Sequence, residues 1–129
     1  MDKAMDEYVI KQTVETKLTR QDIDDIMCSA LEGGVNYWCW KVEVVGDKYL
    51  GEWASDQISR GGRLKFYDAE TEDTWVLTLQ KFLNGFKLWV KRGLDHGACR
   101  NGVVDGCMID AADADVIVQL SLFGDVIFG

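Results

Sequence analysis

Apolar residues recur at helical spacing in three segments of the chain. The predicted helices run from Thr19 to Gly33, from Thr78 to Gly93 and from Asp110 to Gly124. Each begins at a side chain that can accept hydrogen bonds from free backbone N–H groups, and each ends at a glycine. In the third helix, Val118 and Leu122 widen the apolar face. This predicts that the helix is either deeply buried or in contact with another copy of the chain.

Alternating apolar and polar residues predict strands between these helices. The expected strands are 8–16, 35–45 and the two arms of a hairpin, 63–67 and 74–78, joined by an acidic turn at 68–73. In the second strand, the alternation places Trp38, Trp40, Val42 and Val44 on the core face. Residues 49–59 have partly helical character, and the Gly-rich segment 94–109 is expected to be an irregular loop.

These elements predict an α+β fold, in which an antiparallel sheet of about four strands packs against two or three helices. The chain of 129 residues contains no proline, no low-complexity linker and no internal repeat. We therefore expect one domain spanning residues 1–129. The first residues resemble neither a signal peptide nor a transit peptide, and no apolar run approaches the roughly 20 residues that span a bilayer. The sequence predicts a soluble, cytoplasmic protein.

Composition favours binding over catalysis. The formal net charge is −8, and His96 is the one histidine. Acid–base catalysis near neutral pH most often uses histidine, and His96 has no metal-ligand or nucleophile spacing around it. The acidic pairs at 24–25, 70–73 and 113–115 fit helix caps and turns. We therefore expect no enzymatic activity.

The cysteines do not have the spacing of a metal or disulfide framework. They are Cys28, Cys39, Cys99 and Cys107, and no C-x-x-C pair is present. Zinc sites usually gather their ligands from such close pairs. We expect free thiols in a reducing compartment, with no metal and no cofactor.

The negative charge indicates which partners the protein could bind. Repulsion opposes non-specific binding to nucleic acid or to an anionic membrane, whereas a basic protein surface would be attracted. The residues that we predict to contact such a partner are acidic side chains of the first helix and the hairpin turn, together with two aromatic anchors: Asp22, Asp25, Glu32, Glu70, Glu72, Asp73, Tyr37 and Trp53.

An alternative ligand site lies at Arg60, Gly61, Gly62 and Arg63. Adjacent glycines can expose backbone N–H groups, and two guanidinium groups could hold the phosphate of a nucleotide signal. No Walker or dinucleotide-binding pattern surrounds this segment. A plain loop before a strand explains it equally. On the second helix, Lys87 and Lys91 form an i,i+4 pair of like charge that we expect to face solvent.

Several short stretches resemble small uncharacterised proteins encoded by phages and prophages of Gram-positive gut bacteria. They lie between Thr19 and Gly129, at Ala30–Gly34, Tyr37-Trp38, Gln57–Gly62, Lys81–Leu83 and Leu122–Gly124. The resemblance assigns no catalytic residue. It implies a compact acidic accessory protein of the bacterial cytoplasm, a setting in which inhibitors of host defence are common.

Three functions follow as hypotheses. The first is an anti-CRISPR-like inhibitor that binds a host protein with a basic surface, such as a defence nuclease. The second is an oligomeric sponge for a nucleotide signal. The third is a structural or regulatory homo-oligomer of a phage.

Overall fold

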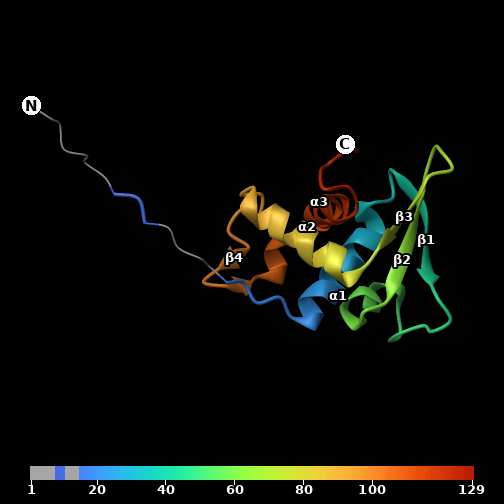
Figure 1. Cartoon of the computed structure of the whole chain (residues 1–129), viewed down its shortest axis with the longest axis horizontal. Coiled ribbons are helices and arrows are strands. Elements are labelled where there is room, and N and C mark those ends of the chain that lie inside the picture. The colour runs from blue at the N-terminus through green and yellow to red at the C-terminus, as the bar shows by residue number, and fades with distance from the viewer. Residues whose placement is uncertain (1–7, 11–14) are drawn as a thin grey trace, which may run out of the picture.

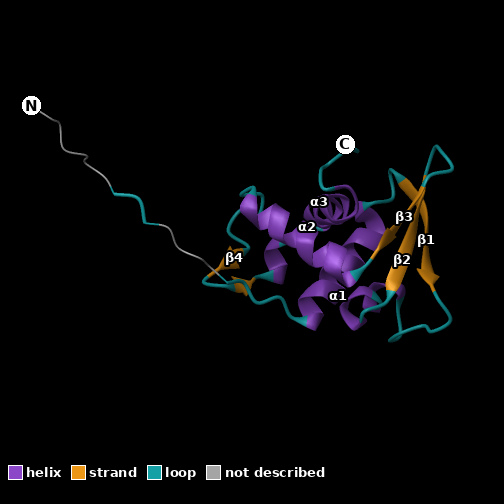
Figure 2. Cartoon of the chain, viewed as in Figure 1, coloured by secondary structure: helices purple, strands orange, loops and turns teal. Residues whose placement is uncertain are grey.

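Three helices lie together, with an antiparallel sheet beside them (Figures 1 and 2). A computed structural model describes residues 8–10 and 15–129. The helices are α1 (Arg20–Ser29), α2 (Leu79–Lys91) and α3 (Ala111–Phe123). The sheet has the order β1 (Cys39–Val45), β2 (Arg63–Asp68), β3 (Thr74–Leu77), while β4 (Cys99–Arg100) and β5 (Val103–Val104) form a separate hairpin. The α+β class is therefore confirmed, with the strands divided between two sheets.

The helices begin where the sequence predicts. The Thr19 hydroxyl accepts a hydrogen bond from the Asp22 N–H at 3.0 Å, and the Asp22 carboxylate accepts one from the Thr19 N–H at 2.9 Å. Asp110 and Asp113 form the same reciprocal cap at α3. These bonds satisfy backbone donors that a helix leaves free at its first turn.

Helix α3 lies at the centre of the packing. Val118 is fully buried and Leu122 packs against the core, so burial within the chain accounts for the wide apolar face of this helix. Helix α2 approaches α3 closely at Gly85, where an added Cβ would lie 2.5 Å from the Ser121 backbone nitrogen. Gly85 is therefore needed for the contact between the two helices.

The predicted core face of β1 is wrong at Trp40. A bulge between Cys39 and Lys41 shifts the register against β2, so Trp40 leaves the alternation. Its side chain is 66% exposed, and its ring lies 5.9 Å from that of Tyr67 on the outer face of the sheet. Cys39 is buried in its place.

The strand predicted at 8–16 falls partly outside the described residues, which omit 11–14. Residues 8–10 have no regular secondary structure. Lys17, just beyond the predicted strand, forms a parallel bridge with Val103 of β5. Segment 94–109, predicted as an irregular loop, contains the β4–β5 hairpin and a short 3₁₀ turn.

Candidate functional site

A surface hollow brings together two of the predicted contact residues, Glu32 and Trp53. Its volume is about 370 Å³, and its lining is Cys28, Leu31, Glu32, Trp53, Ala54 and Ser55. The first three belong to the end of α1 and to the π-helical turn η1 (Ala30–Gly34) that continues it. The last three lie at the start of the 3₁₀ turn η2 (Ala54–Asp56). We call this feature the Trp53–Glu32 hollow.

Buried and capping side chains hold the backbone of Trp53. The Asp56 carboxylate accepts hydrogen bonds from the Trp53 and Glu52 N–H groups, both at 2.9 Å. The fully buried Gln57 donates through Nε2 to the Trp53 carbonyl oxygen at 2.9 Å. The indole itself is 63% exposed. The ring is therefore displayed to solvent on a backbone that is fixed by its neighbours.

The hollow carries negative charge. Burial first, and then the Glu32, Asp25 and Asp56 carboxylates, raise the pKa of the Cys28 thiol above its usual value. Hydrogen bonds from the Trp53 and Glu52 N–H groups lower the pKa of Asp56, so this carboxyl is ionised at neutral pH.

Only part of this charge is neutralised by nearby cations. Arg60 lies 3.8 Å from Asp56 and 3.4 Å from Asp24. Within residues 8–10 and 15–129, neither Asp25 nor Glu32 forms an ion pair.

This arrangement suits the recognition of a cation. An exposed indole beside a carboxylate can bind an ammonium or guanidinium group through cation–π and ionic contacts. Because the pKa of Cys28 is raised, its thiol is largely protonated at neutral pH and is a weak nucleophile. The described residues include no group of three His, Cys, Asp or Glu side chains that could hold a metal ion.

His96 lies outside the hollow. It pairs through Nε2 with the Asp113 carboxylate at 2.9 Å, near the start of α3. This hydrogen bond is the main cause that raises the pKa of His96.

The other predicted contact residues are distributed over different parts of the surface. The Asp22 carboxylate accepts from the Thr19 N–H in the cap of α1, and Asp22 borders a small crevice together with Asp25. Tyr37 and Glu70 line a second hollow, of about 320 Å³, next to the C-terminal residues. Glu72 and Asp73 are exposed on the β2–β3 turn. The eight residues thus do not form one continuous lining, and only Glu32 and Trp53 meet in the hollow described above.

The alternative phosphate loop is already engaged by the protein. The Arg60 guanidinium donates to the Asp56 carbonyl oxygen at 3.1 Å, in addition to its contact with Asp24. The Gly62 N–H donates to the Gln57 carbonyl oxygen at 2.8 Å. Gly61 ends the 3₁₀ turn η3 (Ile58–Arg60) at φ +85°, and Arg63 begins β2. These bonds give the loop a structural role, and a phosphate would have to displace them.

A buried polar cluster surrounds Asp115, and the sequence patterns did not predict it. Its carboxylate accepts hydrogen bonds from the Tyr37 hydroxyl at 2.6 Å, Trp38 Nε1 at 2.7 Å and Gln119 Nε2 at 3.0 Å. Burial, followed by the bond to Asp115, raises the pKa of Tyr37 to about 12. Gln119 Oε1 accepts from the N–H groups of Ile127 and Phe128. The available signal was the polar i,i+4 pair of Asp115 and Gln119 within the apolar stretch 114–120 of α3.

The chain matches no protein-family model, no curated protein and no solved structure. In the described part of the chain, the helices are too short or too polar to cross a bilayer.

Proposed function

We propose that the protein is a non-catalytic binding protein whose Trp53–Glu32 hollow receives an arginine or lysine side chain of a protein partner. The observation that carries this proposal is that the exposed Trp53 and Glu32 line one hollow, and that Glu32 has no cationic partner among the described residues. A large aromatic side chain on a fixed backbone loses little conformational entropy when it is covered. Such residues are frequent hot spots of protein interfaces.

Charge supports a basic partner. The formal net charge of −8 attracts a positive surface at long range, and this steering accelerates association at low ionic strength. At short range, Glu32 supplies the carboxylate that a guanidinium or ammonium group would meet in the hollow.

The partner class that we propose is a host protein with a basic nucleic-acid groove, such as a defence nuclease. The resemblance to prophage-encoded proteins motivates this choice, because it suggests a bacterial host cell. A nuclease presents arginine and lysine side chains to phosphates. An acidic protein seated there would exclude nucleic acid by occupying the same cations.

Affinity capture with matched variants tests the proposal. The tagged protein is incubated with lysate of a Gram-positive gut bacterium at low and high salt, and captured proteins are quantified by mass spectrometry. We expect a basic nucleic-acid-binding protein whose recovery falls about tenfold or more for Trp53→Ala and Glu32→Gln, since hot-spot truncations typically cost ~2 kcal/mol or more.

Glu72→Gln is the control for charge. It removes the same unit of negative charge from the β2–β3 turn, outside the hollow. If Glu72→Gln reduces recovery as much as Glu32→Gln does, net charge rather than the hollow accounts for binding. The captured nuclease should then be inhibited by the unmodified protein and by Glu72→Gln, but not by Trp53→Ala. Cleavage that is unaffected by the unmodified protein would contradict the inhibitory function.

A further inference from the structure

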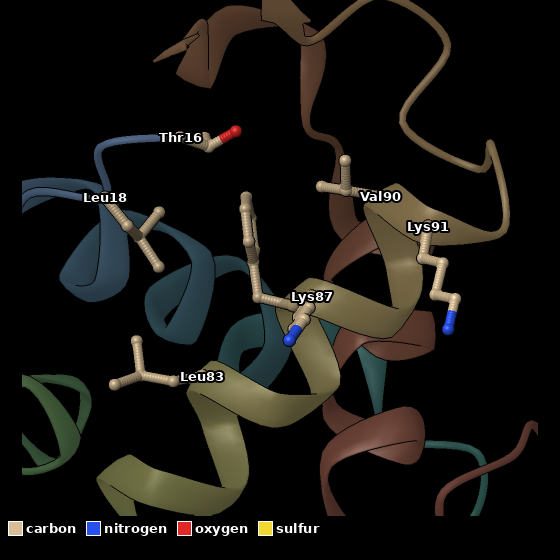
Figure 3. A pocket seen from close by; sticks show the side chains of 7 residues that line it. Thr16, Leu18, Leu83, Lys87, Val90 and Lys91 are labelled. Atoms are coloured by element: carbon tan, nitrogen blue, oxygen red, sulfur yellow. The ribbon is translucent and has the colours of Figure 1, made fainter. Parts of the chain in front are cut away.

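An apolar groove lies between α2 and the segment that leads into α1 (Figure 3). Its volume is about 420 Å³, and its apolar lining consists of Leu18, Leu83, Phe86 and Val90. Lys87 and Lys91 of α2 also line it, and neither forms an ion pair within the described part of the chain. We call this feature the α2 groove. It suits an apolar segment that is flanked by negative charge.

The N-terminal part of the chain has these properties. Tyr8, Val9 and Ile10 are three consecutive apolar residues that are 89%, 86% and 76% exposed. Runs of exposed apolar residues of this kind indicate a contact that is not yet made. In the sequence, Asp6 and Glu7 come directly before them. The segment therefore complements the α2 groove in both apolar character and charge.

We propose that residues 6–10 of one chain bind in the α2 groove of a second copy of the chain. Thr16 lines the groove, so a chain that filled its own groove would have to reverse direction between Ile10 and Thr16. The intervening sequence, Lys11-Gln12-Thr13-Val14-Glu15, contains none of the Gly, Pro, Asn, Asp or Ser residues that favour turns. Of these five residues, Thr13 and Val14 favour extended backbone. The geometry therefore favours a groove in another copy.

The segment that enters α1 is anchored to the turn of the β4–β5 hairpin. The Lys17 N–H donates to the Gly102 carbonyl oxygen at 2.8 Å. Gly102 has φ +72°, and a Cβ there would lie 2.4 Å from the Glu15 carbonyl oxygen. From Thr16, six extended residues reach about 20 Å, which is enough to cross to a neighbouring molecule. A two-fold axis would make both exchanges equivalent and close the assembly as a dimer.

Light scattering coupled to size-exclusion chromatography tests the proposal on the full chain. Over a dilution series, we expect the unmodified protein to have the mass of two chains and to dissociate on dilution. In the double variant Val9→Ser/Ile10→Ser, the dissociation constant should rise at least tenfold. Leu83→Glu, which places a carboxylate among the apolar residues of the groove, should have the same effect. Gln80→Glu adds the same charge to an exposed position of α2 outside the groove and should leave the dimer intact.

A second groove variant keeps the proposal testable if Leu83→Glu fails to fold. Lys87→Glu/Lys91→Glu changes only exposed or rim side chains and should also separate the chains, because it places negative charge beside Asp6 and Glu7. A monomeric unmodified protein at every concentration would overturn the proposal. So would a dimer whose dissociation constant is unchanged by the substitutions at Val9 and Ile10 or at Lys87 and Lys91. Because these positions lie outside the Trp53–Glu32 hollow, failure here would leave capture by the hollow unaffected.

Discussion

Among the described residues, the Asp115 cluster and the Trp53–Glu32 hollow both combine an aromatic side chain with a carboxylate, but the carboxylate is fully paired in the first and not in the second. At Asp115, Tyr37, Trp38 and Gln119 donate hydrogen bonds to the carboxylate. At the Trp53–Glu32 hollow, the ring is exposed and the carboxylate has no cation from the described residues. A carboxylate near aromatic residues therefore stabilises the fold where the chain itself supplies its hydrogen-bond donors. Where the chain supplies no cation, the carboxylate is free to bind one from another molecule.

The largest effect on stability should come from breaking the complete cluster. Asp115→Ala removes the acceptor of three hydrogen bonds, of which those from Trp38 Nε1 and Gln119 Nε2 are buried. A buried donor left unpaired costs about 1–3 kcal/mol, so we expect the free energy of unfolding to fall by about 3 kcal/mol or more. Urea denaturation followed by tryptophan fluorescence measures this loss.

Asp25→Ala is the matched control for this experiment. Asp25 is exposed, and its carboxylate accepts one hydrogen bond from Gln21 Nε2 at 2.7 Å. We expect a change within about 0.5 kcal/mol, as for most surface substitutions. Equal losses for the two variants would contradict the structural role given to Asp115.

Gly85→Ala tests the close contact between α2 and α3 and should have the next largest effect on stability. Alanine favours a helix over glycine by up to about 1 kcal/mol. Here, however, the added Cβ would lie 2.0 Å from Ser121 Oγ as well as close to the Ser121 backbone. Overpacking of this kind costs about 1–3 kcal/mol, so we expect a net loss of stability in urea denaturation. A more stable Gly85→Ala protein would show that α2 and α3 are not packed this closely.

The helices could be predicted because their starts are encoded locally. Thr19 with Asp22, and Asp110 with Asp113, are three residues apart and form caps without help from distant segments. The position of Trp40 could not be predicted in this way. Its exposure depends on a bulge in the pairing of β1 with β2, and the alternation within β1 alone does not reveal that shift.

The sequence allowed single residues of the candidate site to be selected, but it did not show which of them lie close together in the fold. Glu32 and Trp53 could each be selected as surface residues of a binding type. Their meeting depends on how η2 and the following turn η3 pack against α1, where Arg60 of η3 pairs with Asp24 of α1. Asp115 was missed because a carboxylate on a helix usually faces solvent. Its donors Tyr37 and Trp38 come from a distant part of the sequence.

The reactivity of the Cys28 thiol, rather than the stability of the fold, should depend on the negative charge of the hollow. The expected effect is smaller. After burial, the Glu32 carboxylate is the next cause that raises the pKa of Cys28. Glu32→Gln should therefore lower this pKa, increase the thiolate fraction at pH 8 and accelerate alkylation of Cys28 by iodoacetamide a few-fold. Peptide mapping by mass spectrometry follows the modification of each cysteine. Glu70→Gln is the control, and an equal acceleration in that variant would exclude a local effect of Glu32.

The smallest effect on stability is expected at the incomplete site. Trp53→Ala removes a largely exposed ring while leaving the hydrogen bonds of the Trp53 backbone to Asp56 and Gln57 available. We expect the free energy of unfolding to change by no more than about 0.5 kcal/mol. A loss comparable to that of Asp115→Ala would mean that the indole is part of the core.

The indole N–H signals of the five tryptophans test the central claim most directly. In a two-dimensional ¹H–¹⁵N NMR titration with a short arginine-containing peptide, the Trp53 signal should shift and saturate. The signal of Trp38, whose Nε1 is bonded to Asp115, should stay in place. Glu32→Gln should weaken the Trp53 shift, whereas Glu72→Gln should preserve it. A Trp53 signal that does not respond to the peptide, or that responds equally in both variants, would contradict the assignment of the hollow as a binding site for a basic side chain.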